Sequence, residues 1–279
     1  MIVDVHTHCI QPEHTAESSR LAMERAGYPP MERLLFEDFR RDMEAVDRAI
    51  VFGVRAVASG NISPDEYTAE WVGNDPEKLI GFAAVDPTED DYLERMERAA
   101  TDLGLRGFKI YPMLARFNPA DPTVFPMYAM AERLGLPILS HTGAHPGPRA
   151  ILKYSHPLLF DEVAQAFPDL KIVMAHMSHP WQRDCAVVLR KHPNLYADVS
   201  GAGWVRPWQA WEGLVLMQEW GVGDKLLFGS DYPNWTPKQG MEEMRALNEL
   251  VEGTNLPTIS EELIEGIFTR DSLALLGIE

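Results

Sequence analysis

Short apolar runs, rich in β-branched residues, recur eight times before residue 231, and longer amphipathic stretches separate them. The short runs are nearly continuous in apolar residues, which is typical of parallel strands covered by helices on both faces. They occupy residues 2–5, 49–54, 79–85, 107–111, 137–141, 171–176, 195–199 and 226–230. Helical patterns occupy residues 36–48, 63–72, 90–103, 124–134, 158–167, 180–191, 207–220 and 239–250.

Eight strand and helix pairs predict an α/β fold, a closed (β/α)8 or TIM barrel rather than an open sheet. Gly104, Gly135 and Gly221 follow helical patterns, at positions that favour a left-handed C-cap. Residues 260–276 are expected to add closing helices. The chain of 279 residues has a usual size for one barrel and shows no low-complexity linker. We therefore expect residues 1–279 to form a single domain.

The charge balance restricts the classes of partner. The chain has 25 Lys and Arg against 42 Asp and Glu, a net charge of −17 that would repel nucleic acid and anionic membranes. Its two cysteines, Cys9 and Cys185, are too few for a disulfide framework. The N-terminal residues lack a signal-type leader, and no apolar run approaches the roughly 18 residues that cross a bilayer. We expect a cytoplasmic protein with a small-molecule partner, and a homodimer is an open alternative.

The N-terminal DVHTH segment places His6 and His8 two apart on a strand, so both side chains leave the same face. Such a pair is spaced to share one metal ion. The alternative is a pair of partly buried, hydrogen-bonded histidines, and these two residues alone leave both interpretations open.

Polar residues also end three later strands. His141 ends the fifth, His176 the sixth, and Asp231 follows the eighth. In a barrel these ends converge on the C-terminal mouth, where active sites are built. An unpaired buried polar group costs roughly 1–3 kcal/mol, so packing is a poor explanation for such a set. The set favours a metal site.

These motifs together resemble the amidohydrolase superfamily. They are HTH after the first strand, RGFKIYP, SHTG, AHMSHPW, YADVSG and GSDYP, in the family's order over nearly the whole chain. The likeness is to the amidohydrolase-related branch, which includes aminocarboxymuconate-semialdehyde decarboxylase, aromatic-acid decarboxylases and lactone hydrolases. Two residues depart from the pattern: Met177, where many relatives have glycine, and Asp271, where asparagine is usual.

The resemblance implies that His6, His8, His141 and Asp231 bind a divalent metal, with His176 beside it to handle protons. Three imidazoles and one carboxylate suit zinc, with Mn²⁺ as an alternative, and zinc lowers the pKa of a bound water toward about 7. Asp231 would hold the ion through one oxygen and take the water's proton through the other. Asp231 and His176 are thus the predicted catalytic residues.

Lys109, which follows the fourth strand, has three open interpretations. It is a carboxylated bridge between two metals as in binuclear relatives, an ammonium that binds a substrate carboxylate, or a lysine that reaches the barrel rim. Aromatic and cationic residues in the neighbouring loops suit a planar organic acid. The predicted substrate-binding residues are Lys109, Tyr111, Arg55, Arg149 and Trp204, and His145 and Arg206 lie in the same loops. The long segment 9–35 is expected to be a lid.

The leading hypothesis is a metal-dependent hydrolase that adds a metal-activated water to an ester, lactone or amide-type bond of a small organic acid. The alternative is a non-oxidative decarboxylase of an aromatic or unsaturated acid, which would use the same metal ligands. A second alternative is a catalytically silent, metal-free barrel. Its mark would be a missing ligand, and this sequence lacks none of them.

Overall fold

The computed structural model describes residues 1–201 and 206–278 of the chain. Its main sheet has eight parallel strands in the order β1-β2-β5-β6-β7-β8-β9-β10. Each strand falls on one of the predicted apolar runs, so the predicted order of elements is confirmed. The strands are β1 (Val3–His8), β2 (Arg48–Phe52), β5 (Leu79–Val85), β6 (Phe108–Ile110), β7 (Ile138–Ser140), β8 (Ile172–Met174), β9 (Leu195–Asp198) and β10 (Leu226–Leu227).

The sheet closes into a barrel where β1 meets the segment that follows β10. The Val5 N–H donates to the Phe228 carbonyl at 2.9 Å, and the Asp231 N–H donates to the His6 carbonyl at 2.9 Å. These bonds join the first strand to the last, which confirms the predicted TIM barrel. They also bring the N-terminal histidines beside Asp231, although more than two hundred residues separate them in the sequence.

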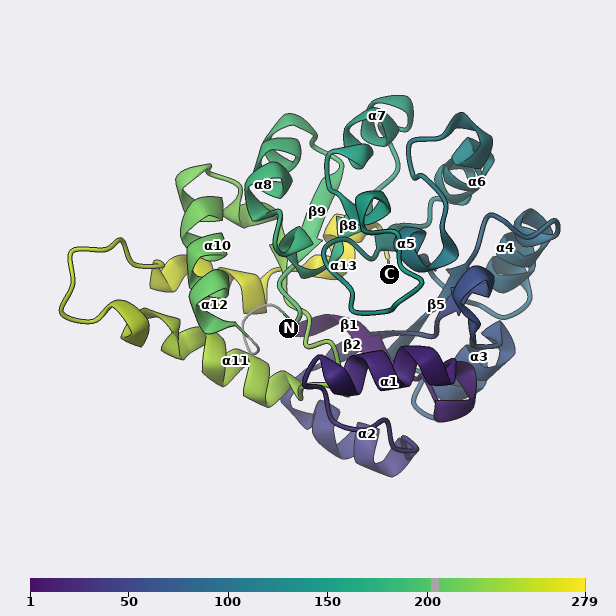
Figure 1. Cartoon of the computed structure of the whole chain (residues 1–279), viewed down its shortest axis with the longest axis horizontal. Coiled ribbons are helices and arrows are strands. Elements are labelled where there is room, and N and C mark those ends of the chain that lie inside the picture. The colour runs from purple at the N-terminus through teal and green to yellow at the C-terminus, as the bar shows by residue number, and fades with distance from the viewer. Residues whose placement is uncertain (202–205, 279) are drawn as a thin grey trace.

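Helices surround the strands, as Figure 1 shows. They are α1 (Glu17–Arg25), α2 (Phe36–Asp42), α3 (Asp65–Gly73), α4 (Tyr92–Thr101), α5 (Pro112–Ala115), α6 (Phe125–Leu134), α7 (Leu159–Ala166), α8 (Gln182–Lys191), α10 (Pro207–Glu219), α11 (Pro237–Ala246), α12 (Glu261–Thr269) and α13 (Ser272–Leu276).

Two apolar clusters hold these layers together. The larger one joins alternate strand residues such as Val51 and Phe108 to buried helix residues such as Tyr128. The smaller one contains the strand residues of opposite parity, such as Phe52 and Phe82, together with Leu273 and Leu276 of α13. Because α13 packs against β1 and joins this inner cluster, the C-terminal segment closes the barrel as predicted.

Some local features were not predicted. Helix α1 lies within the segment expected to be irregular. It buries only Ser19 and Ala22 because its sequence lacks an apolar stripe, and without that stripe the helix gave no periodic signal. A two-stranded hairpin, β3 (Arg55–Ala56) and β4 (Asn61–Ile62), is too short to produce a periodic signal.

The three glycines expected to end helices adopt the predicted left-handed backbone. Gly104, Gly135 and Gly221 have φ of 67°, 65° and 64°. Within residues 1–201 and 206–278, the longest apolar helices fall short of the length needed to cross a membrane. The expected single domain stays a prediction.

Asn194 supports the connection after α7 and provides a test of the fold. Its buried amide donates to the carbonyls of Phe167 at 2.9 Å and Leu170 at 3.1 Å. We expect Asn194→Ala to lower the free energy of unfolding by about 1–3 kcal/mol, because it leaves buried carbonyls unpaired. Urea denaturation measures this loss. The matched control is Asn74→Ala, which removes an exposed amide that donates to the Glu70 carbonyl. Equal effects of the two substitutions would contradict this account of Asn194.

Candidate metal centre

His6, His8 and Asp231 converge at the C-terminal mouth of the barrel. The Nε2 atoms of His6 and His8 lie 3.3 Å and 3.1 Å from the same oxygen, Oδ1 of Asp231. One ligand atom from each residue lies within 4.8 Å of the others. Two imidazole nitrogens and a carboxylate oxygen are donors that zinc and similar cations accept, so this group has the chemistry of a metal centre.

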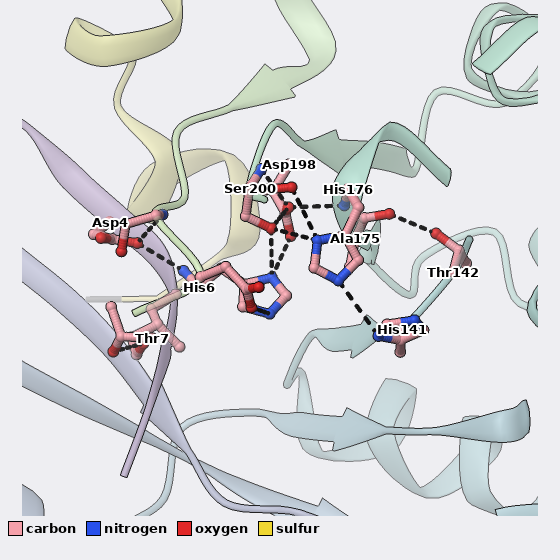
Figure 2. Close-up of polar contacts among 12 residues, drawn as sticks. Asp4, His6, Thr7, His141, Thr142, Ala175, His176, Asp198 and Ser200 are labelled. Atoms are coloured by element: carbon pink, nitrogen blue, oxygen red, sulfur yellow. Dashed lines mark hydrogen bonds and ion pairs between the residues drawn. The ribbon is translucent and has the colours of Figure 1, made fainter. Parts of the chain in front are cut away.

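Asp198, at the end of β9, orients His6 from behind. Its Oδ2 accepts a hydrogen bond from His6 Nδ1 at 2.9 Å, and its Oδ1 accepts the backbone N–H groups of His176 and Ser200 (Figure 2). Because a carboxylate of this kind accepts, the His6 proton lies on Nδ1, and the lone pair of Nε2 faces Asp231. Such outer carboxylates fix the ring and the tautomer of metal-binding histidines.

The contacts of His176 and His141 determine their tautomers as well. His176 Nδ1 lies 2.9 Å from the Ser200 carbonyl, which can only accept, so that nitrogen carries the proton. His176 Nε2 then accepts from His141 Nδ1 at 3.3 Å (Figure 2). His141 Nε2 is left with a lone pair and, among the described residues, has no hydrogen-bond partner although it is buried. A buried, unpaired imidazole nitrogen beside the cluster fits a further metal ligand.

His141 nevertheless stands apart from the tightest grouping. Within the described residues, the groups whose ligand atoms lie within 4.8 Å are His6 with His8 and Asp231, and His6 with His176 and Asp198. The structure thus brings three of the four predicted ligands together and places His141 next to them through His176. The assignment of His141 as a ligand stays a prediction.

Burial and nearby charge keep the imidazoles neutral and the carboxylates ionised. Burial, together with the charge of Lys109, lowers the pKa of His6 to about 3 against the opposing effect of Asp198. Burial, with the neighbouring His176, also holds the pKa of His141 well below its ordinary value. For Asp231, burial raises the pKa, but the hydrogen bond with His8 and the neighbouring imidazoles of His176 and His6 outweigh it and lower the pKa overall. These are the protonation states that metal ligands require.

Several residues of the site hold a left-handed backbone without being glycine. The φ angles are 60° for His176, 46° for Met177, 56° for Ser178 and 64° for Asp231. Such conformations cost roughly 1–3 kcal/mol each and cluster at functional sites. Met177, one of the two departures from the family pattern, therefore occupies a position whose backbone favours glycine.

A cavity of about 1160 Å³ opens above this group, and His8, His141, His176 and Asp231 lie in its wall. A large further part of the wall comes from the segment expected to be a lid. Its lining residues include Ile10, Arg20, Met23, Tyr28, Pro29, Pro30, Met31, Arg33, Leu34 and Leu35.

Lys109 is fully buried in the barrel, and its Nζ has no hydrogen-bond partner among the described residues. Nζ lies 4.5 Å from the ring centre of Phe52 and 5.1 Å from that of Tyr111. Burial lowers its pKa to about 7, against the charges of Asp198 and Asp231. These contacts describe a lysine inside the barrel, and the three interpretations of its role stay open.

The other predicted substrate-binding residues differ in their position. Tyr111 lines the cavity, although its hydroxyl donates to the Gly53 carbonyl at 2.9 Å. Arg55 is held in an ion pair with Glu89, with 2.6 Å between Nη2 and Oε1. Trp204 lies outside the described residues.

Among the arginines in these loops, Arg206 lines the cavity. The residues described as its wall do not include Arg55 or Arg149. Arg149 is exposed and donates to the Ala58 carbonyl at 3.0 Å. Arg206 was noted in the sequence by its position after the seventh strand.

Sequence reasoning missed the parts played by Asp198 and Asn234. The YADVSG motif places one carboxylate in an apolar strand, and that isolated charge is a signal for Asp198. The Asn234 amide donates to Oδ2 of Asp231 at 3.1 Å. Nothing in the sequence marks Asn234, because its loop position depends on the turn after Asp231.

Comparison with known proteins identifies relatives over almost the whole chain. The model of a family described as "Amidohydrolase" matches residues 3–278. A curated protein, 2-amino-3-carboxymuconate-6-semialdehyde decarboxylase of Dictyostelium discoideum, is 26% identical over 254 residues. That match covers 77% of this chain and 66% of the relative, so the chain spans about two thirds of the relative's length.

Solved structures share the fold at lower identity. An uncharacterised TIM-barrel protein of Bordetella bronchiseptica has a TM-score of 0.76 at 23% identity, with 99% of both chains covered. A probable 2-pyrone-4,6-dicarboxylic acid hydrolase of Acinetobacter baumannii has 0.69 at 16%, with 99% of both covered. A dihydroxybenzoic acid decarboxylase of Polaromonas sp. JS666, solved with bound manganese, has 0.67 at 16%, covering 99% of this chain and 96% of its own.

The contact between Asp198 and His6 leads to a prediction for metal affinity. We expect Asp198→Asn to weaken binding of Zn²⁺ and Mn²⁺ by about 10–100-fold, because the amide no longer holds His6 in its binding tautomer. Equilibrium dialysis with metal analysis measures the affinity. The matched control is Asp161→Asn, which removes a similar contact to His192 outside the cavity, 2.6 Å between Oδ1 and Nε2. Unchanged affinity in Asp198→Asn would contradict this role.

Proposed function

Because the chain belongs to the amidohydrolase family, whose model matches residues 3–278, we propose that it is a metal-dependent decarboxylase. It would release CO2 without oxidation from a small aromatic or unsaturated carboxylic acid. The match to the amidohydrolase family confirms the predicted amidohydrolase-type enzyme; which reaction it catalyses is our proposal. The carrying observation is the convergence of His6, His8 and Asp231, of which His8 and Asp231 line the wall of one cavity.

The residues present fit a divalent cation. His6, His8 and Asp231 would hold it, and His141 would join them through the buried lone pair of Nε2. The manganese bound by a decarboxylase of the same fold supports Mn²⁺ as well as Zn²⁺. When bound, such a cation supplies positive charge that holds and polarises the oxygens of an acidic substrate.

Proton delivery is the chemical task left to the chain's own side chains. Loss of CO2 breaks the bond between the carboxylate carbon and its neighbour, and the neighbour keeps the electron pair and must take up a proton. We assign that delivery to His176, which lines the cavity and whose ring the Ser200 carbonyl holds at Nδ1. Its other nitrogen, Nε2, carries the lone pair that faces His141. Nε2 would first take up a proton from solvent in the cavity and then pass it to the carbon that has lost CO2.

Two observations favour decarboxylation over hydrolysis. The curated relative is a decarboxylase, and so is the manganese-bound structure of the same fold. A hydrolase would also need the second oxygen of Asp231 to take a proton from water. That oxygen, Oδ2, accepts a hydrogen bond from the Asn234 amide, which lowers its basicity. Hydrolysis stays the competing reaction, because one structure of this fold is a probable lactone hydrolase.

The cavity wall offers a cation and a ring for the substrate. Both Arg206 and Tyr111 line the cavity, so Arg206 would pair with a carboxylate of the substrate and Tyr111 would offer it an aromatic face. Lys109 would contribute positive charge next to Tyr111, since its Nζ lies 5.1 Å from the centre of that ring. The acid would thus lie between the rings of the site and the guanidinium of Arg206.

Product analysis tests this function directly. We expect purified protein loaded with Mn²⁺ or Zn²⁺ to release CO2 from one of three acids that decarboxylases of this fold or family are named for. They are 2,6-dihydroxybenzoate, 5-carboxyvanillate and 2-amino-3-carboxymuconate 6-semialdehyde. In D2O the product should carry deuterium at the carbon that lost CO2. A chelator should abolish the release, and His176→Asn should lower kcat by about 10²–10⁴-fold because proton delivery is lost.

The control variant for this experiment is His156→Asn, because His156 does not belong to the described cavity wall. The hydrolase reaction is assayed in parallel with 2-pyrone-4,6-dicarboxylate in water enriched in ¹⁸O. Incorporation of ¹⁸O without release of CO2 would replace the decarboxylase with a hydrolase. Turnover that persists after complete removal of metal would refute both reactions.

A further inference from the structure

His145 lines the cavity on the loop that follows β7, yet the proposed chemistry does not use it. Its ring centre lies 5.5 Å from that of His141, with the two rings nearly perpendicular at 77°. The loop therefore presents a second imidazole to the space that the substrate would occupy.

The hydrogen bonds of His145 determine which nitrogen carries its proton. The backbone N–H of Gly147 donates to Nδ1 of His145 at 2.9 Å. A ring nitrogen that accepts carries a lone pair, so the imidazole is neutral and its proton lies on Nε2. Glycine permits this approach, because a Cβ at position 147 would lie 2.8 Å from Nδ1.

Backbone contacts fix the loop that carries His145. The Ala144 N–H donates to the His179 carbonyl at 2.7 Å, and the Gly143 N–H donates to the Ser155 carbonyl at 2.9 Å. Gly143 has φ of 96°, and any Cβ there would collide with the His179 carbonyl oxygen. The Nε2–H of His145 is thus a preorganised donor rather than the end of a freely moving loop.

We propose that His145 is a further catalytic residue, whose Nε2–H donates a hydrogen bond to a substrate oxygen that gains negative charge as CO2 leaves. This inference rests on the proposed decarboxylase function. The electron pair released from the broken carbon–carbon bond spreads onto an oxygen conjugated with that carbon. His145 stabilises this charge and keeps its proton, while His176 supplies the proton that the carbon takes up.

The proposal narrows the substrate class. The acid must carry a hydroxyl or carbonyl oxygen conjugated with the carbon that loses CO2, because His145 offers only a donor there. A simple benzoate would occupy the cavity but leave this donor unpaired, and a site that hydrogen-bonds one substrate oxygen discriminates strongly against an analogue that lacks it.

The competing explanation is that His145 only caps its own turn. His156 makes the same type of contact, with the Leu158 N–H 3.4 Å from its Nδ1, and it lies outside the described wall of the cavity. His156 is therefore the matched control, since it makes the same type of turn contact but does not line the cavity.

The test compares metal-loaded His145→Leu, His145→Gln and His156→Leu for CO2 release from the acid that the enzyme converts. We expect His145→Leu to lower kcat by about 10²–10³-fold with little change in KM or metal content. His145→Gln should recover most of this loss, because its amide N–H replaces Nε2–H. His156→Leu should match the unsubstituted protein. Equal losses in the Leu and Gln variants, or no loss in His145→Leu, would overturn the proposal.

A binding measurement separates this inference from the proposed function. The probe is 2-nitroresorcinol, the inhibitor bound in the manganese-containing structure of the Polaromonas decarboxylase. Calorimetry with it on the metal-loaded protein requires no turnover. We expect His145→Leu to raise its Kd by about 10-fold and His145→Gln to restore it, since one hydrogen bond to a charged oxygen is involved. If no acid loses CO2 while this pattern holds, the decarboxylase assignment fails but His145 still contacts the ligand. Identical affinities in all variants would refute the contact itself.

Discussion

Closure of the barrel between β1 and the segment after β10 is the constraint on which the site depends. The residues that close it are the residues that would bind metal, because the Asp231 N–H donates to the His6 carbonyl. Asp4 reinforces the same seam, with Oδ1 accepting the N–H groups of His6 and Ser230 at 3.0 Å each. Fold and site geometry therefore share one set of hydrogen bonds, and the ligand side chains need little further ordering when an ion binds.

A second network holds the chemistry of the site in one protonation pattern. Asp198 binds His6 and the backbone of His176, and the Ser200 carbonyl sets the tautomer of His176 (Figure 2). Through His176 the pattern reaches His141, whose outer nitrogen keeps its lone pair. The acceptors in this series of hydrogen bonds are the Asp198 carboxylate and the Ser200 carbonyl. Because neither can donate, each imidazole proton has only one position. Neutral donors for a cation are thus prepared by groups that never touch it.

Much of this arrangement could be predicted from the sequence. Eight apolar runs became eight strands, and the polar residues at their ends met at one mouth because parallel strands end together. Local pattern could not reveal partners set by long-range contacts. Arg55 follows a strand on the side of the site, yet it is held by Glu89, which the sequence places 34 residues away. Helix α1 escaped prediction for another reason, because it buries few apolar residues and covers a cavity instead of a core.

The residues that line the cavity have two main origins in the chain. Those that carry the chemistry come from strand ends scattered over the sequence, whereas many of the others come from the single stretch of residues 10–35. Insertions and deletions are tolerated in surface loops far better than in strands. A change of length or composition in that single stretch could therefore give the same reaction centre a different choice of acid. In this barrel, replacing that one segment would change which acid is bound and would leave the residues that carry out the reaction unchanged.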